Sequence, residues 1–140
     1  MTVLLVDAAN VVGARPDGWW RDRLGANVRL LARLAALVGR TVPGPDGTPL
    51  TVDDVVVVVE GAARDVTAPE GITVVRAPGS GDDALADQAA RLAAEGVDVL
   101  VVTADRGLRA RLPEEVPVVG PGWLLGVLAE RPRMSGERPG

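Results

Sequence analysis

Short apolar runs alternate along this chain with longer stretches whose apolar residues recur at helical spacing. Five apolar runs predict buried strands, at residues 2–6, 55–59, 72–75, 99–102 and 116–119. Helices are predicted between them, at about 17–39, 79–95, 108–112 and 121–128. This alternation predicts an α/β domain built on a parallel sheet of roughly five strands.

Loops and ends are marked by residues that break regular structure. We expect a loop over residues 7–18, and a mobile loop at 42–54 because that stretch is dense in Pro and Gly. Residues 131–140 hold three Arg, two Pro and two Gly with little to bury, which predicts a disordered tail. The sequence therefore predicts one domain over residues 1–130, without internal repeats.

The residue types that are absent restrict the chemistry. The chain has 15 basic and 19 acidic residues, a net charge of −4, and it contains no Cys, His or Lys. These absences exclude thiolate and imidazole catalysis, sulfur-ligated metals and a Schiff-base lysine. An enzyme with this composition must work with Asp, Glu, Arg and any metal that carboxylates can hold.

The compartment is predicted by a similar elimination. The first residues lack a basic segment and reach Asp7 after four apolar residues, so they do not form a signal peptide. No apolar stretch approaches the roughly 20 residues of a membrane span. We expect a cytoplasmic protein with no membrane contact.

Acidic residues follow the predicted strands at their carboxyl ends. Asp7, Glu60 and Asp105 come after the first, second and fourth strands, and further acids begin the helix that follows the third. Ligands of parallel α/β sheets bind beyond these strand ends. The acids expected to meet there are Asp7, Glu60, Asp82, Asp83, Asp87 and Asp105.

Two of these acids repel each other within one helix. Asp83 and Asp87 are four residues apart, so they share a helix face, where like charges are destabilising. A divalent cation would offset the repulsion, and oxygen ligands without His or Cys suit Mg²⁺ or Mn²⁺. The sequence thus predicts a carboxylate metal site.

Each acid also has a simpler explanation. Asp7 and Asp105 could form turns, Asp82 could cap a helix, and Glu60 could be a solvated strand end. Their joint placement at one sheet edge favours the metal site over four independent local roles.

Arginines near these acids could bind a polyanion. Arg106, Arg109 and Arg111 follow Asp105, and Arg15 follows the first loop. Arg binds phosphate through two parallel hydrogen bonds, although each of these residues could also serve only solubility. For Trp19 and Trp20, packing on the first long helix is favoured over stacking on bases.

Three motifs resemble the NYN domain family of the PIN-like nuclease superfamily. They are Val3-Leu-Leu-Val-Asp-Ala-Ala-Asn10, Gly79-Ser-Gly-Asp-Asp-Ala-Leu-Ala-Asp87 and Val99-Leu-Val-Val-Thr-Ala-Asp-Arg-Gly107. The resemblance spans roughly residues 2–128. It implies a three-layer α/β/α sandwich around a mostly parallel sheet and metal-dependent ribonuclease activity.

The resemblance also assigns residues to roles. It implies an acidic set of Asp7, Asp83, Asp87 and Asp105. Asn10 and Thr103 match the supporting polar residues of the family. Glu60 stands where relatives often have Asp, and the tandem pair leaves open whether Asp82 or Asp83 is the ligand.

The favoured hypothesis is a Mg²⁺- or Mn²⁺-dependent ribonuclease that acts on single-stranded or structured RNA. Two alternatives stay open: a nucleotide phosphohydrolase with the same metal site, and a non-catalytic RNA-binding regulatory module. The sequence leaves open the RNA target, endo- or exonuclease action, the number of metal ions and whether the chain forms a homodimer.

Overall fold

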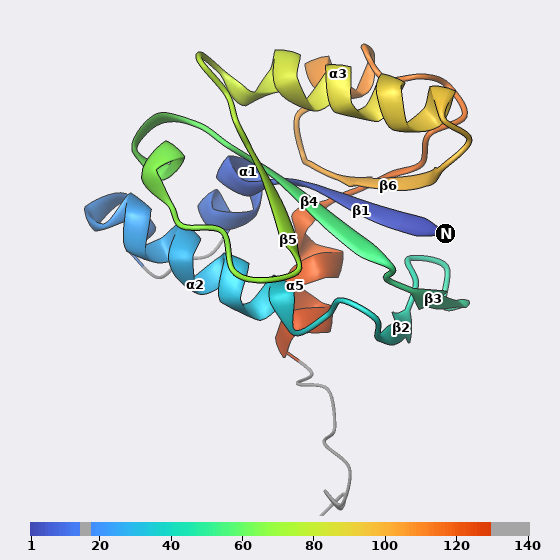
Figure 1. Cartoon of the computed structure of the whole chain (residues 1–140), viewed down its shortest axis with the longest axis horizontal. Coiled ribbons are helices and arrows are strands. Elements are labelled where there is room, and N and C mark those ends of the chain that lie inside the picture. The colour runs from blue at the N-terminus through green and yellow to red at the C-terminus, as the bar shows by residue number, and fades with distance from the viewer. Residues whose placement is uncertain (15–17, 130–140) are drawn as a thin grey trace, which may run out of the picture.

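Five parallel strands form the central sheet of the computed structural model, which describes residues 1–14 and 18–129. The strand order is β5-β4-β1-β6-β7 (Figure 1). The strands are β1 (Thr2–Asp7), β4 (Asp54–Val59), β5 (Ile72–Arg76), β6 (Asp98–Val102) and β7 (Val118–Val119). The α/β prediction with a parallel sheet of about five strands is confirmed.

Helices cover both faces of this sheet, which makes the fold a three-layer α/β/α sandwich. One face packs against α1, α2 and α5, and the other packs against α3 and α4 (Figure 1). The α-helices are α1 (Ala8–Gly13), α2 (Arg23–Ala35), α3 (Gly81–Ala94), α4 (Arg106–Arg109) and α5 (Pro121–Ala129). The 3-10 helices are η1 (Trp19–Arg21) and η2 (Gly61–Asp65).

The central strand β1 contributes to both cores. Leu4 and Val6 lie in the core on the α2 side, whereas Val3 and Leu5 lie in the core on the α3 side. Successive side chains of a strand point to opposite faces, so a strand covered on both sides must be apolar throughout. This explains the uninterrupted apolar run that precedes Asp7.

Two predicted loops are wrong in part. The residues after Asp7 form the short helix α1, because the Asp7 side chain accepts a hydrogen bond from the Asn10 backbone N–H and caps it. The predicted mobile loop at 42–54 contains an antiparallel hairpin, β2 (Thr41–Pro43) with β3 (Pro49–Thr51). The Trp123 indole N–H donates to the Pro43 carbonyl at 3.1 Å and ties this hairpin to α5.

Some predictions lie outside the described residues. These are the position of Arg15 and the tail at 131–140. None of the described helices has the length and apolar character needed to cross a membrane.

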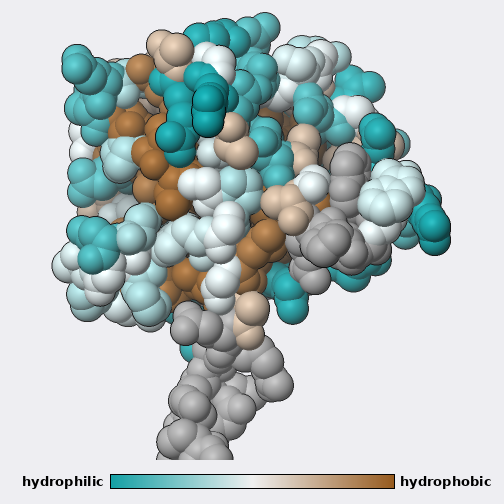
Figure 2. Space-filling view, turned by 180° about the vertical axis from the view of Figure 1, so that it is seen from behind, coloured by the Kyte–Doolittle hydropathy of each residue, from teal (hydrophilic) through white to brown (hydrophobic). Residues whose placement is uncertain are grey.

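The surface mixes apolar and polar groups. On the face shown in Figure 2, brown apolar side chains lie between teal hydrophilic ones. Among the described residues, the exposed large apolar side chains are those of Met1, Trp20, Leu24 and Val28. Packing was predicted for at least one of the two tryptophans; Trp20 is 57% exposed, and the side chain of Trp19 lies outside the described part of the structure.

Candidate active site

The carboxyl ends of the three middle strands bring the site together. Asp7 ends β1, Glu60 follows β4, and Thr103 follows β6. The chain passes from β1 outward to β4 and β5, then returns to β6 on the other side of β1. The order of the strands therefore reverses between β1 and β6, which is where open α/β sheets bind ligands.

Asp7 is a buried carboxylate with a defined orientation. The residue is only 5% exposed. Its Oδ2 accepts hydrogen bonds from Asn10 Nδ2 at 2.6 Å and from Thr103 Oγ1 at 2.8 Å. Oδ1 accepts from the Asn10 backbone N–H at 3.4 Å. An ionised carboxylate can accept about four hydrogen bonds, so Oδ1 retains a lone pair for a further ligand.

Burial raises the pKa of the Asp7 carboxyl, because a low-dielectric interior disfavours the charged form. The hydrogen bonds from Thr103 and Asn10 lower this pKa but do not outweigh burial, and the negative charge of Glu60 adds to the rise. Within the described residues, none of these groups acting on Asp7 is a cation. The carboxylate is thus held in place by neutral donors and has no positive partner.

Asp105 is connected to Asp7 through Thr103. The Thr103 hydroxyl donates to Asp7 and also accepts from the Asp105 backbone N–H at 3.1 Å. The Asp105 side chain accepts from the Leu108 backbone N–H at 3.0 Å, so it caps α4. The turn predicted for Asp105 is therefore found as a helix cap, and the same residue is linked to Asp7 through Thr103.

Asp82 is the member of the tandem pair that faces these two acids. Partial burial raises the pKa of Asp82, and the negative charges of Asp105 and Asp7 raise it further. Asp82 lies in the first turn of α3, whereas the N-cap position belongs to Ser80. Asp7, Asp82 and Asp105 from three separate elements consequently form one electrostatically coupled group, which we call the acidic triad.

Glu60 connects the end of β4 to the start of α3. Its Oε2 accepts from the Gly81 backbone N–H, which is one of the unpaired donors at the beginning of that helix. Glu60 also acts electrostatically on Asp7. It therefore has a structural role at the margin of the triad.

Asp83 and Asp87 are not brought together with Asp7. Both are exposed, and Asp83 pairs with Arg111 at 2.6 Å. The hydrogen bond to Asp83 raises the pKa of the Arg111 guanidinium, and the negative charges of Asp82 and Asp87 raise it further. The structure therefore places an arginine beside the exposed acids of α3.

Two other predicted arginines lie on α4. Arg106 and Arg109 are exposed there, in the helix that Asp105 caps. Both therefore lie within four residues of Asp105, the triad residue at which α4 begins.

The residues present suit a hard cation by their donor chemistry. The triad offers only carboxylate oxygens, which Mg²⁺ and Mn²⁺ prefer. Within residues 1–14 and 18–129, no three acidic groups are close enough together to hold a metal ion jointly. Mg²⁺ commonly binds one or two carboxylates and keeps several waters, so this donor set fits such an ion without a cage.

A cavity of about 370 Å³ lies beside Glu60, at the margin of the triad. It lies between α1, α2, η2 and the start of α3, and Glu60 and Ser80 are among its lining residues. Asn27 of α2 also lines it and was not singled out from the sequence. The available signal was a polar residue on a helix whose neighbouring positions, such as Ala26 and Leu30, are buried and apolar.

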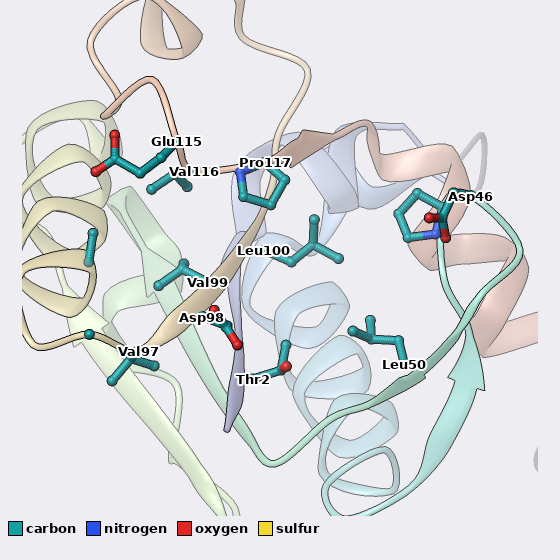
Figure 3. A pocket seen from close by; sticks show the side chains of 13 residues that line it. Thr2, Asp46, Leu50, Val97, Asp98, Val99, Leu100, Glu115, Val116 and Pro117 are labelled. Carbon is teal, nitrogen blue, oxygen red and sulfur yellow. The ribbon is translucent and has the colours of Figure 1, made fainter.

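A larger cavity, of about 650 Å³, lies at the opposite edge of the sheet (Figure 3). Its lining includes Thr2 and Asp98, which begin β1 and β6, together with Pro117. Five residue steps along β1 separate Thr2 from Asp7, or about 17 Å. The larger cavity is therefore separate from the triad.

Solved structures with a similar fold include Rae1 (YacP) from Bacillus subtilis. The chain aligns with it at a TM-score of 0.69 and 17% identity, covering 93% of this chain and 75% of Rae1. Its W164L mutant aligns at a TM-score of 0.65 and 18% identity, covering 93% and 76% respectively. At this identity the similarity establishes a shared fold.

Sequence comparisons add no assignment. No protein-family model matches the chain, and no curated protein matches it.

Proposed function

We propose that this protein is a Mg²⁺- or Mn²⁺-dependent ribonuclease that hydrolyses phosphodiester bonds in RNA. The observation that carries the proposal is the acidic triad: a buried, oriented carboxylate at the strand-order reversal, coupled to two further acids and, among the described residues, without a cation acting on it. The fold shared with Rae1 and the motif resemblance to NYN domains support the same class.

The ion would be held by Asp7 together with Asp82 or Asp105, with Glu60 at the margin and waters as its remaining ligands. A bound divalent ion lowers the pKa of a coordinated water and neutralises negative charge that develops on phosphate oxygens. Clustered carboxylates favour binding of such an ion, because it relieves their mutual repulsion.

The surrounding residues position the reacting groups. Asn10 and Thr103 fix the Asp7 carboxylate, so that Oδ1 keeps its free lone pair toward the ligand. Arg106 and Arg109 on α4 would bind the phosphate through charge-assisted hydrogen bonds. Both arginines are exposed, so RNA can reach them from solvent.

The test is cleavage of end-labelled RNA with Mn²⁺, with and without a chelator. We expect Mn²⁺-dependent products from the parent protein and at least a hundredfold slower cleavage by Asp7→Asn, whose circular dichroism should match the parent. Glu114→Gln, which changes an exposed acid outside the triad, is the control and should cleave normally.

Parallel reactions with nucleoside triphosphates separate the alternatives. Phosphate or pyrophosphate release without RNA cleavage would identify a nucleotide phosphohydrolase. RNA retention without any product at saturating Mn²⁺ would identify a binding module and overturn the proposal.

A further inference from the structure

One buried polar atom beside the triad has no partner. Asn27 is only 4% exposed, and its Nδ2 donates to the Arg23 carbonyl at 2.8 Å in the preceding turn of α2. This bond fixes which end of the amide carries the nitrogen. Within the described part of the chain, Asn27 Oδ1 is buried and accepts no hydrogen bond.

An unpaired buried acceptor destabilises the folded state, and roughly nine in ten or more buried polar groups have a hydrogen-bond partner. Asn27 lines the cavity of about 370 Å³ next to the triad. A single water occupies about 30 Å³, so the cavity has room for a much larger group. A ligand with an N–H or O–H donor would satisfy this acceptor.

The walls of the cavity favour a flat, uncharged group. Ala9, Val12 and Ala63 give it small apolar side chains, while Glu60 and Ser80 lie on the side toward α3. Arg23 and Glu60 line the cavity with opposite charges, so the lining carries no net charge for an anion such as phosphate to neutralise. A neutral ring with a polar edge matches both the apolar and the accepting parts of the lining.

We propose that this cavity binds a nucleobase of the RNA, and that Asn27 Oδ1 accepts a hydrogen bond from the exocyclic amino group of that base. Adenine and cytosine carry such an amino donor, whereas uracil presents a carbonyl acceptor at the corresponding edge, as thymine does. Glu60 borders both the triad and the cavity, so a phosphodiester at the triad brings an adjacent base to this cavity. This inference rests on the proposed ribonuclease function and adds base preference to it.

The test measures binding of fluorescein-labelled RNA decamers by anisotropy, with divalent ions removed so that no cleavage occurs. We expect the parent to bind C10 about tenfold more tightly than U10, since the exocyclic amino group of cytosine donates to the buried acceptor, whereas uracil places a carbonyl oxygen at that position. U10 with its fifth base changed to adenine should likewise bind more tightly than U10 carrying hypoxanthine there.

Asn27→Leu should bind all four decamers equally while retaining the parent's affinity for U10. Its melting temperature should not fall, because the substitution removes an unpaired buried oxygen. Val28→Ala, at an exposed position of the same helix, is the matched control and should keep the preference.

Equal binding of all decamers by the parent would overturn the inference. An Asn27→Leu variant that keeps the base preference would also overturn it, and the cavity would then hold only water. Failure of this inference differs from failure of the proposed function. Mn²⁺-dependent cleavage without base preference would contradict only the base-binding cavity. Base preference without cleavage would contradict only the proposed nuclease activity. Absence of any RNA binding overturns both.

Discussion

At the residue scale, Asp7 carries a charge in a place that disfavours it. Its neutral donors orient the carboxylate without cancelling the cost of burial, so the pKa stays above the ordinary value. Buried charged residues of this kind lower the stability of the fold and are found at functional sites.

Asp7→Asn should therefore raise the melting temperature at pH 7.5 in the presence of a chelator. A carboxyl whose pKa is higher in the folded than in the unfolded state binds protons on folding, so the parent gains stability as the pH falls through that raised pKa. The amide does not titrate, and the advantage of the variant should shrink toward pH 4. Thermal melts of both proteins from pH 4 to 8 would measure this. A variant less stable than the parent at pH 7.5 would contradict it.

Thr103 links two acids through one hydroxyl, which donates to Asp7 and accepts from the Asp105 N–H. Thr103→Val should cost about 2 kcal/mol of unfolding free energy, because hydrogen bonds to charged groups contribute more than neutral ones. It should also raise the pKa of Asp7 further, so that the acid limb of the cleavage profile moves to higher pH. Thr103→Ser keeps the hydroxyl and should leave that limb in place. Urea titrations and pH–rate profiles would provide the two measurements.

At the element scale, short helices begin at the residues of the site. Asp7 caps α1 and Asp105 caps α4, so both acids have a structural role that does not need a metal. The two roles can be separated by variants that keep the cap and remove the charge.

Asp105→Asn should retain the α4 cap, because Asn is as good an N-cap as Asp, and should lose most metal-dependent cleavage. Asp105→Ala should lose cleavage and also about 1 kcal/mol of stability. Denaturant unfolding alongside RNA cleavage would distinguish them. Full cleavage by Asp105→Asn would show that Asp105 serves α4 alone.

The sequence predicted the elements better than the positions of side chains on them. Apolar runs identified the strands and placed Asp7 and Glu60 at one sheet edge, because parallel strands end together. They could not decide between Asp82 and Asp83, since neighbouring helical residues differ by about 100° in direction. The phase of α3 depends on how its Leu85 packs into the core, which is a tertiary property.

The helix α1 and the β2–β3 hairpin were missed for a related reason. Each is short. The hairpin is tied to α5 by the Trp123 bond to Pro43, which local sequence does not reveal, whereas the Asp7 cap of α1 is local and was interpreted as a turn. Asn27 was missed because its unpaired oxygen becomes apparent only when the neighbouring elements are in place.

At the scale of the whole molecule, the acidic triad brings together β1, α3 and the loop after β6. An ion bound there would hold these elements together in the folded state alone. Anything that binds only the folded state stabilises it, by about 2.7 kcal/mol at a concentration one hundred times Kd. Metal binding is therefore measurable as global stability, independently of any RNA.

We expect Mn²⁺ to raise the melting temperature of the parent in a concentration-dependent way that a chelator reverses. Asp82→Asn should reduce this shift, because it removes one of the three coupled acids. Asp83→Asn should leave the shift nearly unchanged, since Asp83 pairs with Arg111 at the surface and does not join the triad. The two variants remove the same charge from adjacent positions, so net charge cannot explain a difference between them. Equal loss in both would assign the metal to the whole acidic face of α3, and an unchanged shift in both would remove α3 from the site.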